Sequence, residues 1–383
     1  MPMKIAHARI YPLSIPLSDP IKMSGETVFD AKTVVLQLVD EKGYSGWGEA
    51  SVAPLMTGET LDSLLANLRY LVQKVRGISW EDPRNLTAEL NKVLYGNSSA
   101  KSCLQMALLD IYTQKENVVL WKFLRTLFKK NDLDKPLPIP ILRMLGGSIE
   151  KEQMDAESLR RQGYRHWKIK VGLLPLEQDI KRVETLLNLL GEDTVSVDAN
   201  GAMNIEDAIR FTQSDKVGRL AFAEQLITSN SSTFDFCRLK NESKIAIGLD
   251  ESIHGLREVE QFIELKAFDG ASLKLIKTGG LIEAMECALM LENNNLKINL
   301  ACKVAETSIS AAATAAIGFA LGRLPWGYSM SNQYLSFDVC KVPLVAENGL
   351  LDSSKLNAPG IGIDPDIMLL KSAIAKEYSV ISC

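Results

Sequence analysis

Two lysines occupy alternate positions of the short apolar segment H-W-K-I-K-V-G, residues 166–172. Alternate residues of a β-strand point to the same face, so Lys168 and Lys170 share one. If that face is exposed, the lysines protect an edge strand. If it is buried, two ammonium groups lie side by side where charge is costly. The segment alone leaves both alternatives open.

Acidic residues and a third lysine follow at regular intervals. Asp198 ends the run T-V-S-V-D, Glu224 ends L-A-F-A-E, Asp250 ends I-A-I-G-L-D, and Lys274 lies in A-S-L-K. Counted from Lys170, the intervals are 28, 26, 26 and 24 residues. One β/α unit has about this length, so we expect these side chains at one level of a barrel, where strand ends carry catalytic groups.

Three converging carboxylates cannot all stay ionised without a cation. Oxygen ligands favour a hard metal, and Mg²⁺ suits three carboxylates with water or substrate oxygens. Positive charge from the metal and from a second lysine lowers the pKa of a neighbouring lysine, so that its neutral amine can remove a proton. Lys170 and Lys274, facing each other, would suit removal of a proton α to a carboxylate, with the metal stabilising the enediolate. Taken singly, Asp198 has an alternative as a helix cap, and Asp250 with Glu251 as a solvated pair.

From residue 136 onward, short apolar runs alternate with amphipathic segments such as 176–190. This alternation predicts parallel β/α units, and seven or eight of them favour a closed barrel over an open sheet. No G-x-G-x-x-G opens a helix after the first strand, which disfavours a dinucleotide-binding fold. The runs are 138–145, 166–172, 194–201, 220–226, 245–252, 271–277, 298–303 and 326–331.

The first 130 residues have a different pattern, which predicts a small α+β unit. Strand-like stretches at 4–17 and 31–50, the second with a D-E-K-G turn, precede the helical patterns. These helical patterns cover 61–75, 85–94 and 99–115.

Composition excludes several classes of function. The chain has 43 basic and 47 acidic residues and a net charge of −4, without a basic stretch, which argues against a nucleic-acid or membrane partner. Its six cysteines lack zinc spacing and disulfide pattern. The N-terminus does not resemble a signal peptide, and the apolar stretch 308–322 is better explained by a buried helix than by a bilayer span. We expect a reducing, cytoplasmic location.

In this order, the motifs resemble the enolase superfamily, specifically its muconate lactonizing enzyme subgroup. The resemblance covers nearly the whole chain and implies a TIM-like (β/α)7β barrel with an N-terminal α+β capping domain. The expected divisions are a capping domain at 1–130, a barrel at 131–350 and a segment at 351–383 that packs back on the capping domain. Mg²⁺, a small carboxylate substrate and a homo-oligomer are also implied. The motifs are K-I-K (168–170), D-A-N (198–200), A-E-Q (223–225), D-E-S (250–252) and S-L-K-L-I-K-T-G-G (272–280).

The resemblance also implies roles for individual residues, since enzymes of this superfamily use a lysine or histidine base with Mg²⁺. Lys170 and Lys274 would form the acid/base pair, and Lys168 would tune Lys170 and support the substrate carboxylate. Asn200 and Glu251 would contact the metal ligands without binding the metal themselves. A histidine base is disfavoured because the sixth strand carries Lys274. The implied Mg²⁺ ligands are Asp198, Glu224 and Asp250.

Substrate choice in this family comes from the capping domain. The segments 18–27 and 51–60 resemble two mobile loops that close over the site. Met23, Leu55 and Met56 would form an apolar lid, although exposed apolar residues also occur without function. Trp47 could offer its ring to a cationic group, or be a core residue. Further candidate contacts with substrate are Thr57, Glu306 and Asp338.

The segment Y-L-S-F-D-V (334–339) departs from the D-x-D with which dipeptide epimerases of this subgroup grip an ammonium group, since it offers only Ser336 and Asp338. Together with 272–280 and 299–309, it resembles the branch of betaine epimerases and cis-3-hydroxyproline dehydratases. We therefore expect a racemase or epimerase of an amino-acid derivative: a proline betaine, an amino acid or a dipeptide. A lyase on the same scaffold is the alternative, namely a cis-3-hydroxyproline dehydratase, muconate cycloisomerase or o-succinylbenzoate synthase. The remaining alternative is a non-catalytic binding barrel, which would tolerate loss of a metal ligand or a base. The presence of all three lysines and all three acids argues against it.

Overall fold

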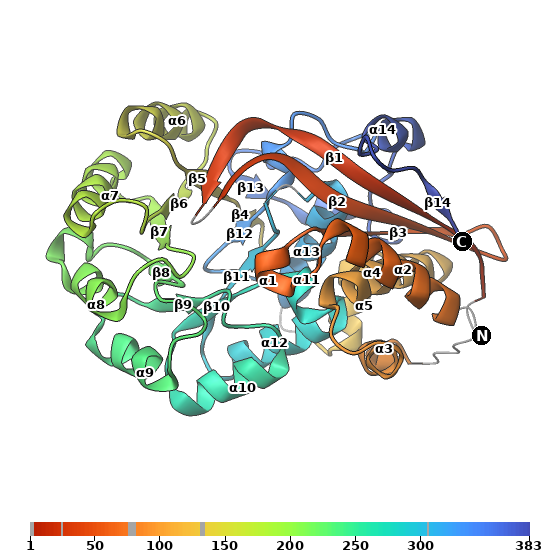
Figure 1. Cartoon of the computed structure of the whole chain (residues 1–383), viewed down its shortest axis with the longest axis horizontal. Helices are drawn as coiled ribbons and strands as arrows, with labels where there is room; N and C mark the ends of the chain where they lie inside the picture. The colour runs from red at the N-terminus through yellow and green to blue at the C-terminus, as the bar shows by residue number, and fades with distance from the viewer. Residues whose placement is uncertain (1–3, 24–25, 76–81, 131–134, 305) are drawn as a thin grey trace.

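The computed structural model describes residues 4–23, 26–75, 82–130, 135–304 and 306–383. A four-stranded antiparallel sheet with its helices lies beside an eight-stranded parallel sheet that is ringed by helices (Figure 1). Within the described residues, no helix combines the length and the apolar character needed to cross a bilayer.

The parallel sheet forms a closed barrel. Its strands neighbour one another in sequence order, and a parallel bridge between Ile141 and Tyr328 joins the first to the last. The eight predicted apolar runs all contain a strand, so the predicted barrel is confirmed. The strands are β5 (Leu142–Leu145), β6 (His166–Lys170), β7 (Thr194–Asp198), β8 (Phe222–Glu224), β9 (Ile247–Leu249), β10 (Gly270–Leu273), β11 (Lys297–Ala301) and β12 (Tyr328–Ser329).

Within the described residues, seven helices connect consecutive strands outside the barrel, with the short α11 (Leu275–Thr278) preceding the sixth of them. Their apolar stripes face the sheet; in α7, for example, Ile180, Val183 and Leu187 are buried at helical spacing. The last of these helices is rich in Ala and buried along its whole length, as its sequence predicts. The seven are α6 (Ile149–Arg161), α7 (Leu176–Leu190), α8 (Ile205–Gln213), α9 (Thr233–Glu242), α10 (Leu256–Leu265), α12 (Leu281–Asn293) and α13 (Ser308–Leu321).

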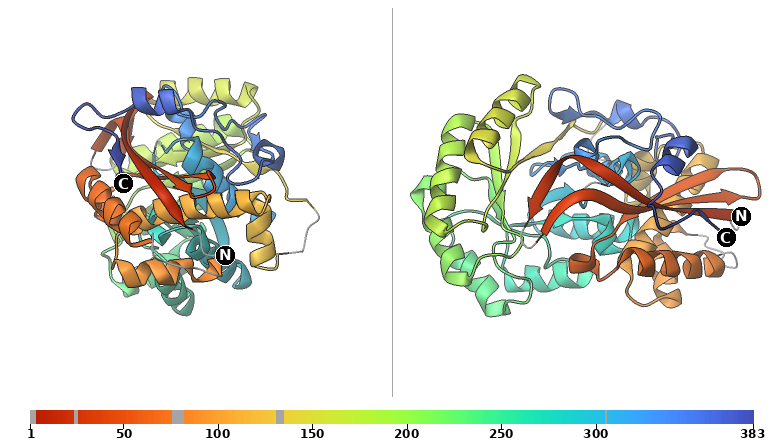
Figure 2. Two further views of the ribbon diagram at one scale, coloured as in Figure 1. Left: turned by 90° about the vertical axis from the view of Figure 1, so that its right-hand side faces the viewer. Right: turned by 45° about the horizontal axis from the view of Figure 1, so that its top comes forward.

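The antiparallel sheet belongs to the N-terminal unit. The long hairpin of β1 (Ile5–Met23) and β2 (Glu26–Asp40) extends from this unit towards the β5–β6 side of the barrel (Figures 1 and 2). The predicted D-E-K-G turn leads from β2 into β3 (Ser45–Ser51). The helices are α1 (Pro54–Thr57), α2 (Leu61–Val75), α3 (Leu86–Val93), α4 (Ser98–Lys115) and α5 (Leu120–Leu127).

Strand β3 lies directly on the backbone of α4. A Cβ atom on Gly46 would lie 2.1 Å from the Ala107 carbonyl oxygen, and one on Gly48 would lie 1.9 Å from that of Cys103. Only glycine fits at both positions. The same strand continues into the segment that reaches the barrel, so this contact fixes where that segment starts.

The C-terminal residues return to the N-terminal unit. β14 (Ile381–Ser382) pairs with β1, and the Asp110 carboxylate of α4 accepts a hydrogen bond of 2.9 Å from the Ile361 amide. The Trp121 indole of α5 donates to the Leu356 carbonyl oxygen. The other elements of this region are β4 (Ile139–Pro140), its partner β13 (Leu350–Leu351), and α14 (Ile367–Ser372).

Candidate active site

The ends of β6, β7 and β8 bring three charged side chains into one row. Lys170 is in register with Asp198, and Asp198 with Glu224. Residues in register on neighbouring strands point to the same face, so all three side chains lie on one face of the sheet. Lys168 shares this face two residues earlier and is also buried. The edge-strand alternative for the lysines is wrong, because β6 is paired on one side with β5 and on the other with β7.

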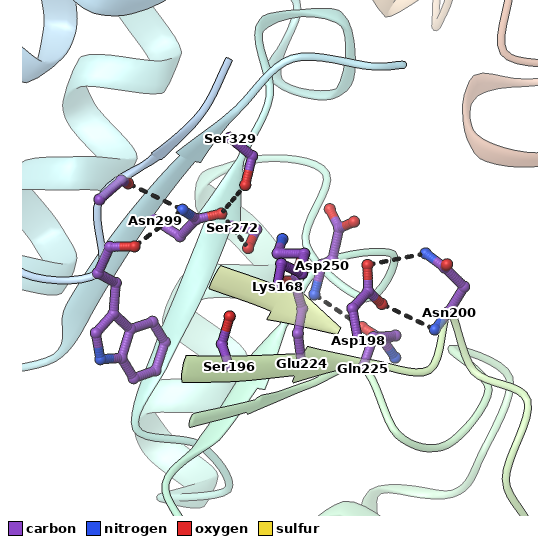
Figure 3. Close-up of polar contacts among 12 residues, drawn as sticks. Lys168, Ser196, Asp198, Asn200, Glu224, Gln225, Asp250, Ser272, Asn299 and Ser329 are labelled. Carbon is purple, nitrogen blue, oxygen red and sulfur yellow. Dashed lines mark hydrogen bonds and ion pairs between the residues drawn. The ribbon is translucent and has the colours of Figure 1, made fainter. Parts of the chain in front are cut away.

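Asp250 follows β9 and Lys274 follows β10, and both side chains are buried beside this row. Figure 3 shows the carboxylates gathered at the strand ends with Lys168 among them. Each carboxylate is paired with a lysine. The pairs are Lys168 Nζ–Glu224 Oε2 at 2.5 Å, Lys170 Nζ–Asp198 Oδ2 at 2.7 Å, and Lys274 with Asp250.

The ion pairs determine the pKa values of the cluster. Burial raises the pKa of Asp198 and Asp250, but their lysine partners outweigh burial and hold both values below the ordinary one. The pKa of Glu224 is raised, because burial and the other two acids outweigh Lys168. Burial lowers the pKa of Lys168 and Lys274, yet the surrounding carboxylates raise both above the ordinary value. The predicted lowering of a lysine pKa therefore requires a cation that competes for these carboxylates.

The three acids suit a hard cation, because they are buried oxygen donors and because those of Glu224 lack hydrogen-bond partners among the described residues. Apart from the ion pair with Lys168, no hydrogen-bond donor of the described residues satisfies the buried oxygens of Glu224. Among the described residues, no three acidic, histidine or cysteine side chains are arranged as a metal site, and each of these acids is instead paired with a lysine. Oxygen donors of this kind are the ligands that Mg²⁺ prefers.

Asn200 links the acids to the next loop. Its side-chain oxygen accepts a hydrogen bond of 2.7 Å from Lys170, and its amide nitrogen donates to Glu251 at 2.9 Å. Its backbone N–H donates to Asp198 Oδ1 at 2.9 Å. A left-handed φ of 44°, which asparagine tolerates better than most residues, allows this arrangement. Burial and the Asp250 charge raise the pKa of Glu251 to about 7. Asn200 thus connects Lys170, Asp198 and Glu251 by hydrogen bonds.

Two contacts of Asp250 were missed from the sequence. The Gln225 side-chain oxygen accepts a hydrogen bond of 2.9 Å from the backbone N–H of Asp250 (Figure 3) and one of 3.1 Å from that of Ser252. Lys277 Nζ lies 2.6 Å from Asp250 Oδ1. The available signal was the i, i+3 spacing of Lys274 and Lys277, which places both on one side of a helical turn.

A buried polar layer also escaped prediction. Asn299 on β11 accepts a hydrogen bond of 3.1 Å from Ser272 on β10 and donates one of 2.9 Å to the Gly327 carbonyl oxygen. Figure 3 shows this layer beside the acids. It connects three neighbouring strands, and nothing in the apolar pattern of the strands distinguishes it.

A cavity of about 690 Å³ lies between the strand ends and the N-terminal unit. Lys168, Lys170 and Lys274 line it, as do the predicted lid residues Leu55 and Met56. Leu55 is 83% exposed, and its role as a lid residue remains a prediction. Lining residues that were not predicted include Phe29, Asp30, Lys32, Met144, His254, Lys303, Met330 and Tyr334.

The predicted loop 18–27 is mostly strand, because β1 and β2 continue to the hairpin tip. The bridge between Leu17 and Leu335 and the Ser336 N–H donating to the Pro16 carbonyl oxygen join the hairpin to the barrel side. Residues 24 and 25 and the side chain of Met23 lie outside the described part of the chain, so its lid contact remains a prediction.

Two predicted substrate contacts from the N-terminal unit are not among the described residues that line the cavity. Trp47 is buried with its ring centroid 6.4 Å from that of Tyr11, which favours the core alternative. The Thr57 hydroxyl accepts a hydrogen bond from Ser99 and donates to the Ala53 carbonyl oxygen.

Glu306 and Asp338 are likewise absent from the described cavity lining. Glu306 is buried and accepts a hydrogen bond of 3.0 Å from the Ser51 hydroxyl. Asp338 accepts hydrogen bonds from the Ser308 amide and hydroxyl at the start of α13, as a capping acid does. At the end of the last strand, the cavity-lining residues are Ser329, Met330 and Ser331.

The fold and the site together define a barrel enzyme with a capping domain. Residues 151–368 match the family profile described as "Enolase C-terminal domain-like". Residues 5–124 match that of the "Mandelate racemase / muconate lactonizing enzyme, N-terminal domain". The chain belongs to the mandelate racemase/muconate lactonizing enzyme group of the enolase superfamily, and is an enzyme of the isomerase or lyase class.

Individual relatives carry different activities. The chain is 28% identical over 371 residues to the o-succinylbenzoate synthase of Bacillus subtilis, covering 96% of each. It is 27% identical over 361 residues to an L-Ala-D/L-Glu epimerase of Clostridium acetobutylicum, covering 92% of this chain and 96% of the relative. A dipeptide epimerase of Cytophaga hutchinsonii, crystallised with Mg and D-Ala-L-Val, has the same fold over all of both chains, with a TM-score of 0.88 and 22% identity.

Proposed function

We propose that this protein is a Mg²⁺-dependent racemase or epimerase that exchanges the proton on the carbon α to the carboxylate of an amino-acid derivative. The placement of Lys170 and Lys274 carries the proposal. β6 and β10 lie four strands apart in a barrel of eight, so these buried lysines approach the cavity from opposite sides. The paired acids lie between them.

Inversion at one carbon needs a base on one face and an acid on the other. One lysine, neutral and released from its carboxylate, takes the α-proton: the C–H bond breaks and an N–H bond forms. The ammonium group of the other lysine then delivers its own proton to the opposite face. Mg²⁺ held by Asp198, Glu224 and Asp250 would supply positive charge that stabilises the negative charge developing on the substrate carboxylate. Lys168, buried beside Lys170, adds positive charge on the same side.

The cavity supports a substrate with an apolar substituent. Phe29 and Leu55 line it from the capping side, and Met144 and Met330 from the barrel side. The end of the last strand contributes serine and methionine rather than an acid, and the lining acid of the capping side, Asp30, already accepts a hydrogen bond from the Ser14 hydroxyl. A proline betaine or an N-substituted amino acid is therefore favoured over a dipeptide with a free amino group.

A lyase on the same scaffold is the second candidate. The observation that favours it is the likeness to an o-succinylbenzoate synthase over 96% of both chains. Because a lyase of this family would keep the same lysines and acids, the two functions differ in the fate of the substrate. Loss of water or ring opening without return of a proton to the α-carbon would identify the lyase.

The test follows exchange of the α-proton in D₂O with Mg²⁺ by NMR, using proline betaines, N-substituted amino acids and dipeptides as substrates. We expect Lys274→Ala to keep exchange for one stereoisomer and Lys170→Ala to keep it for the other. Neither variant should interconvert the isomers, because each retains a base on one face only. Both should still bind Mg²⁺, since neither lysine is a ligand. Interconversion by one variant at near the wild-type rate would contradict the two-base assignment.

The proposal also includes that the protein forms a homo-oligomer and that it is located in the cytoplasm. The six cysteines are all free, which suits a reducing compartment. Size-exclusion chromatography with light scattering tests the assembly.

A further inference from the structure

Lys277 is a buried lysine that the proposed reaction does not use. It lies in α11, directly after β10, and its side chain is fully buried. Its ammonium group donates to Asp250 Oδ1 at 2.6 Å, to the Ser272 carbonyl oxygen at 3.0 Å, and to the Asp250 carbonyl oxygen. An ammonium group has three N–H donors, so these three acceptors satisfy it completely.

The two oxygens of Asp250 have different partners. Oδ1 is paired with Lys277, and Oδ2 with Lys274. Lys274 lines the cavity, whereas Lys277 is not among the described residues that do. Asp250 itself is not among the described residues that line the cavity, and Oδ2 is its oxygen on the side of the cavity-lining Lys274. Two of the three contacts of Lys277 are to backbone carbonyl groups, which anchor it independently of the carboxylate.

Asp198 has a further partner of a different kind. Asp198 retains the backbone N–H of Asn200 when Lys170 leaves it. Without Lys277, Asp250 would keep no side-chain counter-charge once Lys274 turned to a substrate. A buried carboxylate without a counter-charge is costly and tends to move or take up a proton.

We propose that Lys277 is a positioning residue for the divalent-cation site. It holds the Asp250 carboxylate with Oδ2 towards the cavity and keeps its charge compensated while Lys274 is engaged elsewhere. The proposal rests on the proposed function, because it assumes that Asp250 is a metal ligand. Partners of metal-binding groups typically contribute 10–100-fold to metal affinity when they orient a ligand.

The test measures Mn²⁺ binding to the full chain by electron paramagnetic resonance, without substrate or turnover. We expect Lys277→Met to raise the Kd for Mn²⁺ 10–100-fold. The matched control is Lys115→Met, which breaks a pair of 3.0 Å with the buried Asp40 in the capping domain. It should lower the Tm and leave the Kd for Mn²⁺ unchanged. A Kd within twofold of wild type in Lys277→Met would overturn the proposal.

A second variant keeps the proposal testable if Lys277→Met fails to fold. If Lys277→Met does not fold, Asp250→Asn in the same chain removes the carboxylate whose Oδ1 has lost its partner. Recovery of the fold supports the assignment of Lys277 to Asp250, and continued failure to fold overturns it. If the wild-type chain binds no Mn²⁺, the proposed function fails as well. If the wild type binds Mn²⁺ and Lys277→Met binds it equally, only this inference fails.

Discussion

Asp198, Glu224 and Asp250 are buried acids whose charges are compensated by lysines at contact distance. Removing one partner of such a pair costs about 3–5 kcal/mol, because the remaining charge stays buried without compensation. Substitutions at these pairs carry this cost, so the fold of each variant has to be measured together with its activity. Asn and Gln replace the acids with neutral side chains of nearly the same size.

For the proposed ligands we expect Asp198→Asn, Glu224→Gln and Asp250→Asn each to weaken Mg²⁺ binding and abolish turnover, with the fold kept. Each change removes one negative oxygen donor from a site that needs three. Titration calorimetry with Mg²⁺ gives the affinity, and circular dichroism reports on the fold. Full activity of protein treated with EDTA would contradict the metal requirement.

Glu306 provides a pH prediction outside the metal site. Burial, and after it the charge of Glu49, raises the pKa of Glu306 from 4.5 to about 8. The folded chain then keeps a proton that the unfolded chain has lost, so the contribution of Glu306 to the free energy of unfolding falls as pH rises from about 4.5 to 8. Glu306→Gln should flatten this decline in urea-unfolding experiments at pH 5, 6, 7 and 8. An equally steep decline in the variant would contradict the assignment.

The sequence could predict those site residues that recur at the same position of successive β/α units. Asp198, Glu224 and Asp250 recur once per β/α unit, so their spacing predicts a common level. Asp338 and Glu306 lie outside this repeat. Sequence alone cannot distinguish an acid that caps a helix, as Asp338 does, from an acid that contacts substrate. Gln225 and Lys277 act through hydrogen bonds across strands, which no periodicity in one strand reveals.

At the scale of elements, the predicted lid at 51–60 is anchored at both ends. The Ser51 hydroxyl donates to Glu306, and the Glu59 carboxylate accepts from the backbone N–H groups of Ser99 and Ala100 at the start of α4. Between these anchors lie α1 and the cavity-lining Leu55. Any lid motion is therefore expected between residues 52 and 58.

Hydrogen exchange tests this expectation. Without a ligand, backbone amides of 52–58 and of the hairpin tip should exchange faster than those of the barrel strands, because α1 is a single helical turn and only β1 and β2 pair with each other at the tip. A productive ligand should slow exchange there and leave the amides of β3 and α4 unchanged. Equal protection of 18–27 and 51–60 with and without such a ligand would contradict the closing lid.

Element prediction succeeded where periodicity was strong. The helices at 61–75 and 99–115 and the barrel strands were all identified from the recurrence of apolar residues. The segment 18–27 was predicted as a mobile loop from its resemblance to a loop of the family's capping domain. In the structure, pairing between β1 and β2 extends through most of it, although it contains Pro20 and Gly25.

At the scale of the whole molecule, Glu49 joins the two domains. It lies on β3, is fully buried, and its carboxylate accepts hydrogen bonds from the Thr307 amide and hydroxyl and from the Ser310 amide of α13. Thr33 of the capping domain donates to the same group at 2.9 Å. The carboxylate of one domain thus satisfies the N-terminus of a helix in the other.

We expect Glu49→Gln to lower the free energy of unfolding by at least about 2 kcal/mol, since a single amide oxygen cannot satisfy these buried donors. Urea unfolding followed by circular dichroism measures the loss. Glu41→Gln, at an exposed position of the same domain, is the matched control and should change stability by less than about 0.5 kcal/mol. Equal stability of the two variants would show that the contact does not join the domains.

The pairing of β14 with β1 has a consequence for biosynthesis. The ribosome delivers the capping-domain strands first, but the edge of β1 receives its partner at Ile381 and Ser382 only after the barrel has been made. Domains generally fold as units, N-terminal first, during synthesis. Here the edge of β1 in the capping domain stays uncovered until Ile381 and Ser382 have been synthesised. Such an edge is a template for pairing with another chain. The nascent polypeptide is therefore most exposed to misassembly, and to chaperone capture, in the interval between the synthesis of β1 and that of β14.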